Sequence, residues 1–157
     1  MTPASTQILD IIDLRLKRIT TANGFTQTVK SKNVHRSKRT LFTSTQIPGI
    51  NYYSLNDNIT KDFGVENHSL NISIEYLDKT IKEPFNDIAA NRAVDIIKAV
   101  NEDTNGVESP YLGDLIDTLE ILGVTPIVDQ KNVPSCGVVV DFLAKYKTPI
   151  FDHTTIL

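Results

Sequence analysis

The sequence of 157 residues contains one cysteine, one methionine and no tryptophan. A lone Cys136 forms no internal disulfide and leaves thiolate-rich zinc and iron-sulfur sites without ligands. No apolar run approaches the ~20 residues of a membrane helix. Asp10 and Asp13 lie where a signal peptide has its apolar core. We therefore expect one domain, residues 1–157, made in the cytoplasm and not inserted in a membrane.

Sequence motifs of nucleotide-binding and catalytic sites are also missing. The seven glycines are scattered, and none belongs to a phosphate-binding loop. His35, His68 and His153 have no second histidine or cysteine at metal-ligand spacing, so we interpret them as surface histidines. Asp114 and Asp117 are spaced to share one helix face, which is typical of a solvated acidic surface. The sequence therefore predicts no catalytic residue, no cofactor and no metal, and we expect a protein that is not an enzyme.

Charge is distributed unevenly, although the net charge is only -3. Residues 14–56 hold eight bases and no acid, whereas residues 99–130 hold seven acids and no base. If the two regions lie on different faces, copies of the chain attract one another head to tail, and such contacts build rings or filaments. The alternative is that the two regions are separately solvated surfaces.

The basic segment 30–39 and a pair of tyrosines are the candidate interaction residues. Bases at this density are able to contact phosphates, but the segment lacks interleaved aromatic residues and the chain has a pI of about 5.6. Tyrosine is enriched in protein interfaces, and adjacent strand residues point to opposite faces, so at most one tyrosine is expected in the core. The candidate protein-interface residues are Lys30, Lys32, Arg36, Lys38, Arg39, Tyr52 and Tyr53.

Hydrophobic periodicity predicts three helices. Apolar residues from Ile8 to Ile19 recur at helical spacing, and Asn23-Gly24 predicts an end near Ala22. A second apolar stripe covers residues 85–100 and follows Pro84. A third helix is predicted from the cap Ser109 to a stop at Gly123.

Strands are predicted between these helices and after them, at residues 25–35, 40–47, 50–55, 69–77, 125–128 and 137–146. The clearest is 69–77, where apolar and polar residues alternate strictly, as in a sheet with one buried face. The fold class predicted is α+β, with one mixed or antiparallel sheet, an N-terminal helix and two further helices packed against it. The tail, residues 149–157, lacks periodicity and is expected to be flexible or to order against a neighbour.

The order of these segments resembles the tail terminator (tail completion, minor tail) proteins of tailed bacteriophages. The segments that carry the resemblance are Asn23-Gly24-Phe25, the helix 89–100, Tyr111-Leu112-Gly113-Asp114-Leu115 and the closing strand 138–148. The resemblance extends over nearly the full chain, but the family's Gly-Gly-like stretch before the third helix is reduced here to Tyr111-Leu112-Gly113.

This resemblance implies a structural protein of the virion, at the head-proximal end of the tail. Its partners would be itself in a homohexameric ring, the tail tube protein and the head-tail connector protein. DNA would pass through the lumen without specific binding. The alternatives are another head-tail junction protein, such as a head-completion or tube-related protein, and a small nucleic-acid-binding domain.

Overall fold

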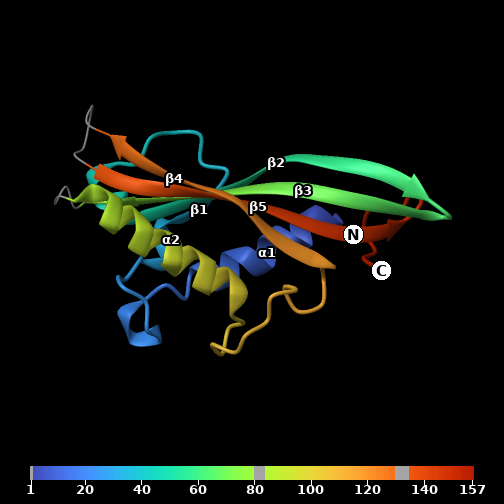
Figure 1. The fold of residues 1–157 in the computed structure, drawn as a ribbon, viewed down its shortest axis with the longest axis horizontal. Helices are drawn as coiled ribbons and strands as arrows, with labels where there is room; N and C mark the ends of the chain where they lie inside the picture. The colour runs from blue at the N-terminus through green and yellow to red at the C-terminus, as the bar shows by residue number, and fades with distance from the viewer. Residues whose placement is uncertain (1, 80–83, 130–134) are drawn as a thin grey trace.

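The computed structural model describes residues 2–79, 84–129 and 135–157, which form a five-stranded sheet with two α-helices on one face (Figure 1). The elements are α1 Ala4–Leu16, β1 Val34–Arg36, β2 Gly49–Asp62, β3 Val65–Asp78, α2 Phe85–Asn101, β4 Thr118–Asp129 and β5 Ser135–Pro149. The strand order is β1-β2-β3-β5-β4, with β1 parallel to β2 and the other pairs antiparallel. The predicted α+β class with a mixed sheet is confirmed. Within the described ranges, neither helix is long and apolar enough to cross a membrane.

The core lies between the two helices and the central strands. Strict alternation in β3 and β5 points one set of side chains toward the helices, as the sequence predicted. Ile74 and Val140 are opposite each other in neighbouring strands, and both are completely buried. From α2, Ile96 packs into the same cluster. Burial of such aliphatic side chains, each contributing about 1.5–3 kcal/mol, is what holds this part of the fold together.

Helix α1 is present as predicted but ends at Leu16, six residues before Ala22. The hydrogen bonds change there from the α-helical to the 3-10 pattern, because the Ile19 amide donates to the carbonyl of Leu16, three residues earlier. The β-branched run that begins at Ile19 disfavours further helix. Gly24, with φ of +80°, ends a short 3-10 turn instead of α1.

The predicted third helix from Ser109 to Gly123 is wrong. Leu112, Gly113 and Asp114 all have positive φ, which breaks any helix, and the chain enters β4 at Thr118. The predicted cap, Ser109, is used differently: the buried guanidinium of Arg15 donates to its carbonyl and side-chain oxygens and to the carbonyl of Val100. Residues 118–128 are instead paired with β5, so the predicted strand 125–128 is only the second half of β4.

The predicted strands 25–35 and 40–47 are also wrong, so the basic segment 30–39 does not connect two paired strands. Between residues 25 and 47 the strand is β1 alone, and it pairs with residues 50–52 of β2. Side-chain hydrogen bonds replace a strand ladder around it: the Asn33 amide donates to the carbonyls of Thr45 and Pro48, and Thr43 and Gln46 cap a 3-10 turn. In contrast, the strand predicted at 50–55 is confirmed and extends to Asp62.

Strands β2, β3 and β5 continue beyond the helices to a narrow end of the molecule (Figure 1). The C-terminal segment folds back there against the first residues of α1. The Ala4 amide donates to the carbonyl of His153 at 2.7 Å, and the side-chain amide of Gln7 donates to the carbonyl of Thr154. Both described ends of the chain therefore lie beside the same end of the sheet.

Candidate functional site

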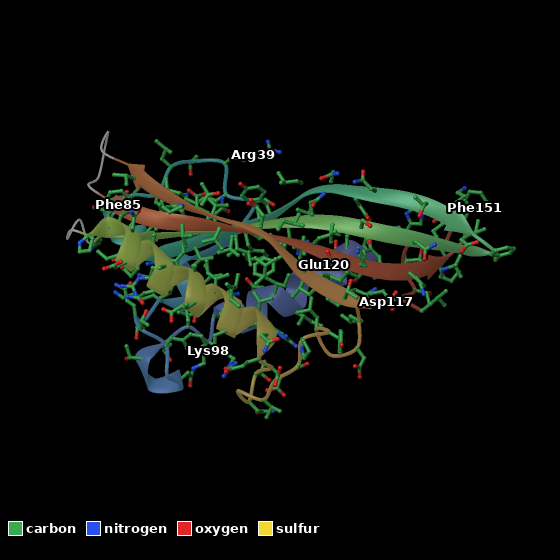
Figure 2. The ribbon with its side chains drawn as sticks, viewed as in Figure 1. Arg39, Phe85, Lys98, Asp117, Glu120 and Phe151 are labelled. Atoms are coloured by element: carbon green, nitrogen blue, oxygen red, sulfur yellow. The ribbon has the colours of Figure 1, made fainter. Side chains whose placement is uncertain are left out.

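The basic candidate residues are spread over a 3-10 turn, β1 and the loop that follows it. Arg36 forms an ion pair with Asp10 of α1, at 2.9 Å. Lys30 and Lys32 are exposed beside the β1 edge of the sheet, and no carboxylate in the described ranges pairs with them. Arg39 is also exposed and lies on the loop that crosses the face opposite the helices (Figure 2). The bases therefore occupy two surfaces, and Arg36 is already paired within the chain.

The two tyrosines lie on opposite faces of β2, as expected for adjacent strand residues. Tyr52 is only 2% exposed, and its hydroxyl donates to Asp13 at 2.8 Å. Burial and this hydrogen bond raise the pKa of Tyr52 well above its ordinary value. Tyr53 is half-buried and borders a shallow pocket with Lys38 and Arg39. Of the two, only Tyr53 has surface to offer a partner.

The acidic block is partly neutralised by bases from other segments. Its described ion pairs are Glu102 with Arg18 (3.7 Å), Asp117 with Lys147 (3.7 Å) and Glu120 with Lys145 (2.7 Å). Glu108 and Asp114 are exposed and have no ion pair among the described residues. Because β1 and β4 are the outermost strands, the unpaired Lys30 and Lys32 lie at one edge of the sheet and Asp114 lies near the other.

Both edges of the sheet present backbone that no described strand covers. At one edge, β4 pairs only with β5 and exposes the aliphatic side chains of Ile121, Leu122 and Val124. At the other edge, β1 covers only residues 50–52 of β2, which leaves residues 53–62 open. An edge strand whose backbone N–H and C=O groups have no partner strand is a template for pairing with another chain. The chain thus offers two unlike edges for association.

A polar cluster, which we call the His68 cluster, occupies the helix-side face at the narrow end of the sheet. Its members are Asp57, Glu66, His68, Tyr146, Thr148 and His153. Asp57 accepts from Nδ1 of His68 at 2.8 Å and from the hydroxyl of Tyr146 at 2.7 Å, and Tyr146 stacks on the imidazole. With the proton on Nδ1, Nε2 of His68 accepts from the Thr148 hydroxyl at 2.9 Å.

Connected in this way, Thr148, His68 and Asp57 have the order of a nucleophile, a base and an orienting acid. Thr148 and His68 are both buried, however, so a substrate carbonyl has no route to the Thr148 hydroxyl. Cys136 is buried as well, and burial raises the pKa of its thiol, which disfavours the reactive thiolate. The geometry at these residues stabilises the fold but does not expose a nucleophile.

Sequence patterns did not predict that Glu66 and His153 of the His68 cluster meet. Nε2 of His153 lies 2.7 Å from Oε2 of Glu66, and ligand atoms of Glu66, His68 and His153 all lie within 4.8 Å of one another. The residues at positions 66 and 68 share a face because side chains alternate along a strand, and this spacing was visible in the sequence. His153, from the C-terminal segment, gave no local signal.

Comparison with known proteins adds no relative: no family model matches the chain, and no curated protein matches it significantly.

Proposed function

We propose that this chain is a structural subunit of a phage tail, which assembles into a ring that ends the tail tube and joins it to the head connector. The proposal extends the sequence resemblance described above. The observation that carries it is the pair of open sheet edges, β4 on one side and residues 53–62 of β2 on the other. Two unlike surfaces on one subunit make heterologous contacts, which close into a ring when the rotation per subunit allows it.

The distribution of unpaired charge supports the same head-to-tail arrangement. Lys30 and Lys32 lie beside β1, and Asp114 lies in the segment before β4. A contact that brings the β4 edge of one copy toward the β1 side of the next places opposite charges near each other. Such complementarity sets orientation and association rate more than affinity.

Size measurement tests whether the chain forms a ring. Light scattering after gel filtration should give roughly 105 kDa, six times the chain mass of 17.5 kDa. Val124→Lys, on the exposed β4 edge, should yield monomer with an unchanged circular dichroism spectrum, because a charge on the edge blocks pairing. The matched control is Val107→Lys, at an even more exposed position in the loop before β4, which should keep the ring.

Charge reversal tests the head-to-tail contact separately. Lys30→Glu with Lys32→Glu should weaken assembly, whereas Arg36→Glu should act mainly by breaking its pair with Asp10. A wild-type monomer at all salt and protein concentrations, or a ring that survives Val124→Lys, would contradict the proposal.

The tube-ending role requires a separate test with tail tube protein. Tubes polymerised with wild-type protein should be capped at one end in electron micrographs, and tails made without it should be overlong. Tails of normal length in its absence would place the protein at the head side of the junction instead.

A further inference from the structure

We propose that Glu66, His68 and His153 form a zinc-binding site that ties the C-terminal segment to β3. The three residues supply two imidazoles and one carboxylate, a ligand set that binds Zn²⁺ and leaves a fourth position for water. Their ligand atoms lie within 4.8 Å of one another. The site is independent of ring formation, because all three ligands belong to one chain.

The distances suit closure around a small cation. Four-coordinate zinc with bonds of about 2.1 Å separates its ligand atoms by roughly 3.4 Å. Nε2 of His153 is now 2.7 Å from Oε2 of Glu66, so these two atoms would separate slightly, and no pair of ligand atoms is more than 4.8 Å apart. The required shifts are of the order of 1 Å. His153 has a side chain that is 51% exposed and belongs to the C-terminal segment, so it is free to adjust.

The surroundings of His68 already orient one ligand. Asp57 accepts from Nδ1 of His68, which leaves the lone pair on Nε2, and Tyr146 both stacks on the ring and donates to Asp57. A carboxylate behind a ligating imidazole fixes its tautomer and raises its basicity. The metal would take the place of the Thr148 hydroxyl as the partner of Nε2.

One positive charge competes with a bound cation. Nζ of Lys61 lies 3.6 Å from Oε1 of Glu66, but the lysine side chain is 56% exposed and also lies over the ring of Phe151. The Glu66 side chain is only 4% exposed, so its charge needs a partner, and a bound Zn²⁺ would supply the positive charge that Lys61 gives up on moving into solvent. Glu66 therefore remains available as a ligand.

Calorimetric titration of the untagged chain with Zn²⁺ tests the site. We expect one ion per chain, with affinity reduced at least tenfold in His153→Ala and in Glu66→Gln. Asp57→Asn, which alters the acceptor that His68 shares with Tyr146 and leaves all three ligands in place, should reduce affinity by about 10- to 100-fold. His35→Ala removes a histidine on β1 and serves as the matched control, with affinity unchanged.

Two further readouts distinguish coordination from loss of folding. Co²⁺ in place of Zn²⁺ should give the visible absorption of a four-coordinate site, and nitrogen-15 spectra of the wild type should show Nε2 of His68 shifting on titration. A fixed excess of Zn²⁺ should also raise the melting temperature of the wild type by more than that of His153→Ala. Absence of single-site binding, or binding by His153→Ala equal to the wild type, would overturn the proposal.

Discussion

Strands β3 and β5 bury different kinds of side chain where the helices cover the sheet and where the strands extend beyond the helices. Where α1 and α2 cover the sheet, the inward side chains of β3 and β5 are aliphatic, such as Ile74 and Val140. Where the strands pass the helices, the same face carries His68 and Thr148, joined by hydrogen bonds. Apolar burial needs a covering layer, and the far end has only the C-terminal segment. The fold therefore changes from hydrophobic packing to polar pairing along a single sheet.

The largest expected effect is in the helix-covered half. Ile74→Ala removes a completely buried side chain and should cost about 3 kcal/mol of unfolding free energy, including the cavity it leaves. Denaturant titration measures this loss. The matched control is Ile59→Ala, at an exposed position of β2, which should cost less than about 1 kcal/mol. Equal losses at the two positions would remove the contrast between the halves.

A smaller loss is expected from the polar half. Asp57→Ala leaves the Tyr146 hydroxyl and Nδ1 of His68 without their acceptor, at a cost of about 1–2 kcal/mol. Hydrogen exchange should accelerate in β2 residues 57–62 and in the C-terminal segment, with amides near Ile74 unchanged. Asp62→Ala, at the exposed end of β2, is the control. Uniform acceleration across the sheet would show that the two halves unfold as one unit.

The smallest effect concerns the sheet face without helices. Burial raises the pKa of Glu75. A hydrogen bond from Asn51 lowers this pKa by a smaller amount, so the net shift is upward. Above about pH 4.3 the unfolded carboxyl ionises before the folded one, so stability falls as pH rises toward the raised pKa. Glu75→Gln should therefore raise the melting temperature by about 1–2 °C at pH 7 and leave it unchanged at pH 3.

Exposed Glu108→Gln is the control for Glu75, and it should change the melting temperature at neither pH. A Glu75→Gln variant less stable at pH 7 than the wild type would show that the charged carboxylate is favoured in the folded chain.

Sequence patterns predicted correctly those elements whose apolar residues follow either the strand period or the helix period, but not both. Strict alternation in 69–77 and the apolar stripe of 85–100 each match a single period, and both predictions were confirmed. The segment after Ser109 was predicted as a helix, but the backbone has positive φ at residues 112–114, and the carbonyl of Ser109 accepts a hydrogen bond from Arg15, more than ninety residues earlier. Long-range hydrogen bonds of this kind leave no local pattern.

The candidate site was predictable to a similar degree. The exposed positions of Lys30 and Lys32 followed from their charge, whereas the strand predicted for residues 25–35 did not form around them. Side-chain amides such as that of Asn33 competed with strand pairing there. The His68 cluster depends on the return of His153 to the start of α1, a tertiary contact.

The first residues of α1 meet the C-terminal segment beside the His68 cluster, which has a practical consequence for handling the protein. An affinity tag at either end would carry its own histidines to within reach of Glu66 and His153, where they would compete for the same ion. A fluorophore attached to the C-terminal segment, in contrast, would report directly on whether that segment stays docked.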